Sequence, residues 1–118
     1  MSYNFNDDTP IYLQIIEHIK TQIISKKYLP KQKIPSVREL SFEFEVNPNT
    51  VQKALCELES LGLIVTERTN GKFVTDNEKL IEDIKSQTIQ KMIEDFYLSM
   101  KKIGIEKNQV LHILSEGK

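Results

Sequence analysis

Apolar side chains recur three or four residues apart along segment 11–23, which is typical of an amphipathic helix with one buried face. The residues on this face are Ile11, Tyr12, Ile15, Ile16, Ile19 and Ile23. Thr9 is expected to cap the helix and Pro10 to occupy its first position, because threonine accepts bonds from free amides and proline has no amide to lose there. Pro30 prevents the helix from continuing, so we expect residues 29–35 to form a loop.

Two further helices are predicted after this loop from their end signals. Ser36 and Glu39 have the spacing of a capping box, so a short helix is expected to begin at Ser36. Asn47 and Pro48 suit the cap and first position of a third helix, and Gly62 supplies the left-handed residue that commonly ends one. The predicted buried positions are Val37, Leu40 and Phe44 in the short helix, and Val51, Ala54, Leu55, Leu58 and Leu61 in the third.

The hydrophobic period changes after the third helix. Segments 63–68 and 72–75 are rich in β-branched residues, and Asn70-Gly71 lies between them. Asn-Gly is a strong hairpin signal, because both central residues of a type I′ turn take positive φ. A two-stranded β-ribbon is therefore predicted, with Asn70 and Gly71 at the centre of its turn.

Two helices are predicted for the rest of the chain. Asp76 is expected to cap a long helix that Gly104 ends, and a short helix is expected over residues 107–114. Their apolar positions include Leu80, Ile84, Met92, Ile93, Phe96, Met100, Ile103, Val110, Leu111 and Leu114. Because residues 76–118 are too few to bury a core of their own, we expect these helices to pack against a second copy of the chain. The alternative is that they fold back on their own subunit.

The order of helix, short helix, turn, helix and β-ribbon is that of a winged helix-turn-helix. The expected fold is mainly α with a small β-ribbon, in which residues 1–75 form the winged helix-turn-helix and residues 76–118 form a helical dimerisation segment. In such a fold the third helix enters the major groove of DNA, and the second helix crosses the backbone. The pattern therefore predicts a DNA-binding protein.

The exposed start of the third helix carries side chains suited to reading DNA. Asparagine and glutamine can bond adenine through two hydrogen bonds, threonine can touch a thymine methyl group, and lysine can hold a phosphate. The residues concerned are Asn47, Asn49, Thr50, Gln52 and Lys53. The alternative is that Asn47 only caps the helix and the others are ordinary surface.

Basic residues outside the third helix are further candidates. Arg38 lies in the first turn of the second helix, where its guanidinium group matches a phosphate or a guanine. The alternative for Arg38 is a surface ion pair with Glu39 or Glu43. Arg68, Gly71 and Lys72 are expected at the ribbon, where a small residue and cations allow close approach to a duplex.

Several of these runs resemble the GntR family of bacterial regulators. They are residues 10–15 (PIYLQI), 34–40 (IPSVREL), 46–55 (VNPNTVQKAL), Leu58-Glu59, Gly62-Leu63-Ile64 and 71–74 (GKFV). The resemblance covers residues 9–75, and the run 46–52 together with the short C-terminal part is most similar to the YtrA-like subgroup. It implies a homodimeric repressor on a roughly palindromic operator, often of an operon that encodes an ABC transporter and the regulator itself. The DNA contacts that it implies are Ser36, Arg38, Asn49, Thr50, Gln52, Lys53 and Gly71.

The chain departs from the family pattern at three places. Pro48 stands where many members have arginine, although the subgroup shares the proline. The glycines usual near Lys27 and Gln32 are missing, so a difference is expected in the loop after the first helix. Thr69-Asn70 replaces a more basic, glycine-rich wing tip.

The composition excludes several classes of protein. With 39% hydrophobic and 28% charged residues in 118, the chain is expected to be soluble and folded. Cys56, the one cysteine, permits no intrachain disulfide and is expected to be at least half-buried. No signal peptide or membrane-length apolar run is present, so the expected location is the cytoplasm. His18 and His112 are isolated, and no catalytic motif occurs, so neither an enzyme, a metal site nor a cofactor is expected.

The net charge of −1 is unusual for a DNA-binding protein, which is commonly basic. No acidic residue lies between Glu17 and Glu39, where lysines and Arg38 cluster, so a local basic face is expected. The neutral charge and the acidic cluster Glu39, Glu43 and Glu45 leave open a protein-interaction module. A ligand-responsive sensor is a third reading, in which an effector would bind at the dimer interface.

Overall fold

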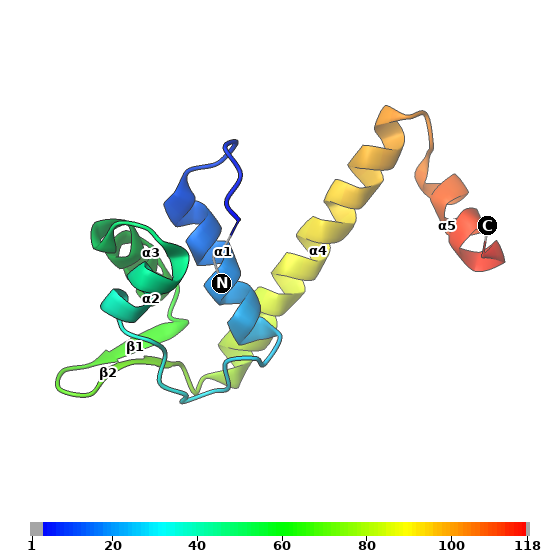
Figure 1. Cartoon of the computed structure of the whole chain (residues 1–118). Coiled ribbons are helices and arrows are strands. Elements are labelled where there is room, and N and C mark those ends of the chain that lie inside the picture. Colours follow the sequence, from blue (N-terminus) through cyan, green and yellow to red (C-terminus); the bar gives the residue numbers. More distant parts are fainter. Residues whose placement is uncertain (1–3, 118) are drawn as a thin grey trace. The chain divides into compact units, whose positions relative to one another are not determined.

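The computed structural model describes residues 4–117 of the chain. The chain divides into two compact units, Met1–Glu82 and Asp83–Lys118. Figure 1 shows their elements coloured along the sequence.

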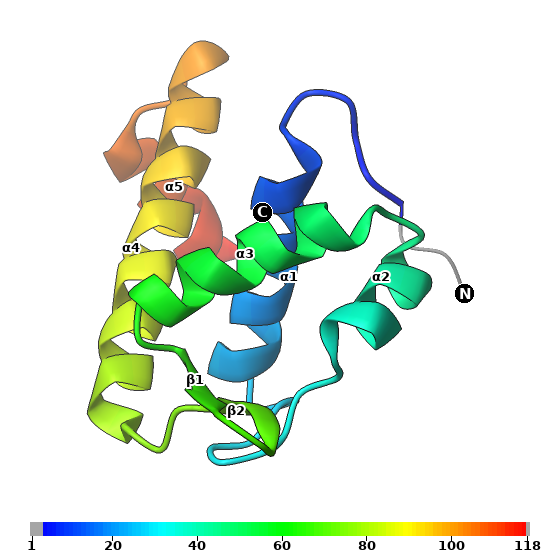
Figure 2. The ribbon, with the colours of Figure 1, turned by 90° about the vertical axis from the view of Figure 1, so that its left-hand side faces the viewer.

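Three helices and a β-ribbon form the first unit. In chain order these are α1 (Ile11–Ile24), α2 (Val37–Phe44), α3 (Pro48–Ser60), β1 (Ile64–Glu67) and β2 (Gly71–Val74), followed by the start of α4 (Glu78–Lys102). α3 packs against α1, α2 and β1. In Figure 2, α3 crosses in front of α1, with α2 to one side and the ribbon below. The predicted winged helix-turn-helix, mainly α with a two-stranded antiparallel sheet, is confirmed.

The core of the first unit is built from the helix faces that the hydrophobic period predicts. Its buried helical side chains are Ile15, Ile16, Ile19, Ile23, Leu40, Phe44, Val51, Ala54, Leu55 and Leu58. The extended segments add Ile34, Leu63, Ile64 and Val74. Ile11 and Leu61 are exceptions, since they are 41% and 46% exposed. Both lie at the end of a helix, Ile11 at the start of α1 and Leu61 at the C-cap of α3.

The caps of α2 and α3 are those predicted. Ser36 Oγ accepts a bond from Glu39 N–H at 3.1 Å, and Glu39 Oε1 accepts one from Ser36 N–H at 2.9 Å. Asn47 Oδ1 accepts a bond from Asn49 N–H at 2.7 Å, and Pro48 is the first residue of α3. These side chains satisfy amides that would otherwise lack partners, so each helix start is well defined.

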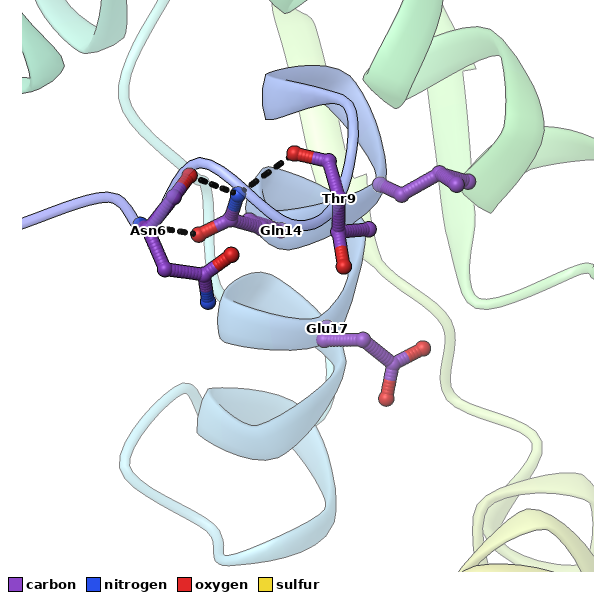
Figure 3. Close-up of a pocket in the computed structure, with 5 residues that line it drawn as sticks. Asn6, Thr9, Gln14 and Glu17 are labelled. Carbon is purple, nitrogen blue, oxygen red and sulfur yellow. Dashed lines mark hydrogen bonds between the residues drawn. The ribbon is translucent and has the colours of Figure 1, made fainter.

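The start of α1 differs from the prediction. Ile11 is its first residue and Pro10 its cap, without any side-chain bond, so the assignment of Thr9 as the cap is wrong. Gln14 reaches back instead: its Nε2 donates to Thr9 O at 2.8 Å and to Asn6 O at 3.0 Å, and Asn6 N–H donates to Gln14 Oε1 at 3.1 Å (Figure 3). The amide of Gln14 therefore ties the preceding segment to the first turn.

The β-ribbon forms, but its turn is not the predicted one. Glu67 pairs with Gly71, so the connecting loop has three residues, 68–70. Asn70 N–H donates to Glu67 O at 3.2 Å, and Gly71, not Asn70, takes the positive φ, 103°. This is the pattern of a three-residue hairpin loop, in which a turn is followed by a glycine bulge. The prediction of a two-residue type I′ turn is therefore wrong.

The first turn of α4 belongs to the first unit. Asn77 caps it, since Asn77 Oδ1 accepts a bond from Leu80 N–H at 3.1 Å, and the prediction that Asp76 caps it is wrong. The helix begins at Glu78, which puts residue 77 and not 76 in the cap position. Ile81 is only 1% exposed and joins the core.

The second unit consists of the rest of α4 and α5 (Lys107–Glu116). Gly104, with φ of 85°, ends α4 as predicted, and α5 extends two residues past the expected end. Exposed apolar side chains are numerous in this unit: Ile89, Met92, Ile93, Phe96, Leu98, Ile103, Leu111, Ile113 and Leu114. Most of those on α4 recur three or four residues apart and share one helix face.

Three charged residues take the left-handed conformation that glycine adopts most easily. Their φ angles are 67° at Lys26, 69° at Lys31 and 57° at Glu45. Lys26 and Lys31 lie in the loop where the expected glycines are missing, and they supply the left-handed positions themselves. Each left-handed residue with a side chain costs roughly 1–2 kcal/mol relative to its right-handed form.

Glu45→Gly should stabilise the protein by about 0.5–1 kcal/mol, because relief of the left-handed strain exceeds the added entropy of glycine in the unfolded chain. Urea unfolding followed by circular dichroism measures the change. Glu43→Gly is the matched control, since Glu43 lies inside α2, and it should destabilise by about 1 kcal/mol. An unchanged or lowered stability of Glu45→Gly would show that this position carries no strain.

Candidate nucleic-acid interface

The predicted reading residues share the exposed side of α3. Asn49, Gln52 and Lys53 are exposed and Thr50 is half-buried, while the opposite side of the helix is buried in the core. The oxygen of Asn47 is used in the cap, which leaves only its amide NH₂ to donate outward. The start of α3 thus presents amide, hydroxyl and ammonium groups together.

Lys53 is held by an aromatic ring from α1. Its Nζ lies 3.9 Å from the centroid of the Tyr12 ring, a cation–π contact. Tyr12 is half-buried in the first turn of α1. The contact links the first sequence run of the family resemblance to the third helix.

Arg38 is exposed on α2, and no ion pair involves it among residues 4–117. Glu39 is occupied by Ser36, whose backbone and hydroxyl hydrogen bonds lower the pKa of the Glu39 carboxyl group. The alternative of an Arg38 ion pair is therefore not what the structure contains. Phe42, one helical turn further on, is 87% exposed, although no sequence pattern predicts an exposed ring there.

Lys72 lies against α3 and not at the tip of the ribbon. Its Nζ is 2.6 Å from Glu59 Oε1 and 2.8 Å from Thr66 Oγ1, and Thr66 donates to Glu59 Oε2 at 2.7 Å. The Lys72 side chain is only 18% exposed. The hydrogen bond from Lys72, and a weaker contribution from Thr66, lower the pKa of Glu59. These three residues brace the ribbon against the end of α3.

The ribbon tip carries Arg68, Thr69 and Asn70, all exposed, followed by Gly71. A residue that the sequence did not single out lies beside it. Lys33 pairs with Phe73 through an isolated β-bridge, and its side chain crosses Gly71. Only the long-range pairing of the loop with β2 brings Lys33 there, so no local signal could have indicated it.

The remaining candidates are less well placed for chemistry. Cys56 is exposed, 3.5 Å from Gln52 Nε2, so the expectation of a buried thiol is wrong: residue 56 follows Gln52 by one turn on the exposed side of α3. His18 packs edge-on against Phe44 at 5.5 Å, and its partial burial lowers its pKa. Within residues 4–117 no cluster of three metal-ligating side chains occurs, and no helix could span a bilayer.

Comparison with known proteins gives consistent matches. The family model for bacterial regulatory proteins of the gntR family matches residues 11–74. The chain is 36% identical over 111 residues to the HTH-type transcriptional regulator YhcF of Bacillus subtilis (strain 168), covering 94% of this chain and 92% of that protein. It is 41% identical over 99 residues to the HTH-type transcriptional repressor YtrA of the same organism, covering 79% and 76%.

Solved structures agree with these matches. A GntR family transcriptional regulator from Listeria monocytogenes has a TM-score of 0.86 and 38% identity, over 95% of this chain and 98% of that chain. The DNA-binding domain of AraR in complex with operator ORX1 has a TM-score of 0.58 and 34% identity, over 64% of this chain and 95% of that chain.

A double-mutant cycle on Glu59→Gln and Lys72→Met should give a coupling of about 0.5–1 kcal/mol at neutral pH, because solvent screens this partly exposed pair. Since the pKa of Glu59 is lowered by folding, its contribution is full above the ordinary value of 4.5 and is lost as the pH falls through the folded pKa. Thermal unfolding at several pH values measures both effects. A coupling that is zero, or that persists when the carboxyl group is protonated, would rule out the brace.

Proposed function

The chain belongs to the gntR family of bacterial regulatory proteins, and on this premise we propose that it is a sequence-specific, DNA-binding transcriptional repressor. It acts as a homodimer on a palindromic operator. The observation that carries the proposal is the exposed start of the capped helix α3, where Asn49 and Gln52 share one side and Thr50 flanks Asn49.

The proposed contacts divide into base reading and phosphate binding. Asn49 and Gln52 carry the amide groups that match adenine in the major groove, and Thr50 lies on the other flank of Asn49. Arg38, Lys53 and Arg68 supply charge for the phosphates on either side. Ser36, Asn47, Gly71 and Lys72 position these groups or allow close approach of the backbone. The operator-bound AraR domain, which has the same fold, supports this arrangement.

The second unit supports a homodimer. The apolar stripe on α4 includes Ile89, Ile93 and Phe96, which are 46%, 43% and 41% exposed in the single chain. Burying such a stripe against its two-fold copy is favourable by about 25 cal/mol per Å² of apolar surface. A two-fold protein dimer matches a two-fold DNA site whose half-sites lie about one helical turn, 34 Å, apart.

The proposal for the regulated genes rests only on similarity to known proteins. The similarity to the repressor YtrA favours the YtrA-like subgroup, for which the resemblance implies control of a transporter operon that includes the regulator gene. The match covers 79% of this chain, which is more than the winged helix-turn-helix of residues 1–75 alone.

One observation favours a second function, binding of a protein partner. Phe42 is 87% exposed on α2 beside the acidic residues Glu39, Glu43 and Glu45. An exposed ring rimmed by charge is typical of a protein contact. This reading predicts a stable complex that Phe42→Ser abolishes, together with no protection of DNA in a footprint.

Arg38→Ala should weaken binding to every duplex by about tenfold, whereas Asn49→Ala should lower operator affinity and leave random DNA unchanged. The reason is that a phosphate contact carries no sequence information and a base contact does. Fluorescence anisotropy with the DNA upstream of the gene and with a scrambled duplex measures both. Lys20→Ala is the control, because it removes the same charge at a position distant in sequence from Arg38, where the lysine is paired with Glu17. Equal wild-type affinity for the two duplexes would refute sequence-specific function.

Ile93→Glu combined with Phe96→Glu should weaken self-association by about a hundredfold or more, because the dimer would bury charges in an apolar stripe. Analytical ultracentrifugation resolves one chain of 13.7 kDa from a pair. Gln87→Glu, on the opposite side of α4, is the control and should leave the dimer intact. A wild-type chain that is monomeric at micromolar concentration would contradict the homodimer.

A further inference from the structure

The sequence places the cation of the wing at Lys72, but the structure gives that residue another task. Lys72 Nζ is 2.6 Å from Glu59 and 2.8 Å from Thr66, and its charge is balanced by the carboxylate. A lysine held in this way offers little charge to a phosphate. The positive charge beside the ribbon must come from another residue.

Lys33 lies beside the ribbon, where Lys72 was expected to supply the charge. The loop before α2 runs alongside β2: Ile34 N–H donates to Lys72 O at 2.9 Å, and Val74 N–H donates to Gln32 O at 2.9 Å. This pairing directs the Lys33 side chain across Gly71. A Cβ on Gly71 would lie 3.0 Å from Lys33 Cε and 3.7 Å from its Nζ. The glycine, at φ of 103°, therefore provides the room in which the lysine lies.

The ammonium group of Lys33 stands at a hollow between α2 and the ribbon. The hollow has a volume of about 320 Å³, and Ser36, Thr69 and Asn70 are among its lining residues. Within residues 4–117 no hydrogen bond or ion pair occupies Lys33 Nζ. Glu39 interacts electrostatically with Lys33, and the Glu39 carboxylate is bonded to Ser36. Ile34 and Val37 add apolar side chains to the lining, and of its two lysines, Lys33 and Lys72, only Lys72 is paired with a carboxylate.

We propose that Lys33, lying across Gly71, binds a backbone phosphate of duplex DNA at this hollow and, beside Arg68 at the ribbon tip, supplies positive charge at the wing. The proposal rests on the function proposed above and adds a residue to its interface. A lysine is a compact, mobile charge that suits a single phosphate, and a glycine lets the DNA backbone come close. Arg38 lies in the first turn of the adjoining helix α2, so the two cations would hold neighbouring phosphates along one strand.

The test is the salt dependence of binding. Each neutralised phosphate contributes about 0.9 to the slope of log affinity against log salt, so Lys33→Ala should lower the slope by about that amount. It should also weaken binding to the operator and to a scrambled duplex equally, by about fivefold to tenfold near 0.1 M salt. Lys33→Arg, which keeps the charge, should retain most of the wild-type slope.

Lys27→Ala is the matched control, since it removes one exposed charge at the loop that follows α1. Its slope should equal that of the wild type, and thermal unfolding of all variants should show that each is folded. An unchanged slope in Lys33→Ala would overturn the proposal. If the wild type binds both duplexes equally, the proposal of specific repression fails, but the change in salt slope in Lys33→Ala still tests the role of Lys33. If the wild type binds no DNA, both proposals fail.

Discussion

The packing of α3 against α1 is the constraint on which the rest of the molecule depends. Val51, Ala54, Leu55 and Leu58 are fully buried against the isoleucines of α1, and this burial fixes the rotation of α3 about its axis. Once that face is buried, Asn49, Gln52 and Lys53 must point outward, since they lie on the opposite side of the helix. The cap at Asn47 fixes the residue at which the helix begins. Packing and capping together thus set the surface that meets a groove.

The net charge of −1 becomes understandable once the ion pairs are known. Lys20, Lys26, Lys72 and Lys91 are paired with carboxylates within the chain, so they contribute little to an external field. The cations that remain on the winged helix include Lys33, Arg38 and Arg68. A protein without excess positive charge can in this way present a basic surface at one place, because its acidic residues are concentrated elsewhere.

The sequence predicted most of what local chemistry decides, although the caps at Thr9 and Asp76 were each misplaced by one residue, and it missed what long-range pairing decides. The capping box at Ser36, the cap at Asn47 and the stop at Gly62 need only near neighbours, and all three are correct. The hairpin turn failed because strand register, not the Asn-Gly pair, sets the loop length. Lys72 was assigned to the tip because its partner Glu59 is distant in sequence, and Lys33 was overlooked because only its pairing with β2 brings it to the ribbon.

The most direct measurement is a crystal structure of the chain with a duplex from upstream of its own gene. The account predicts that the start of α3 lies in the major groove, with the amides of Asn49 and Gln52 within about 3.2 Å of base edges. A complex in which this end of α3 faces solvent or another protein chain, while the DNA contacts a different surface, would contradict it.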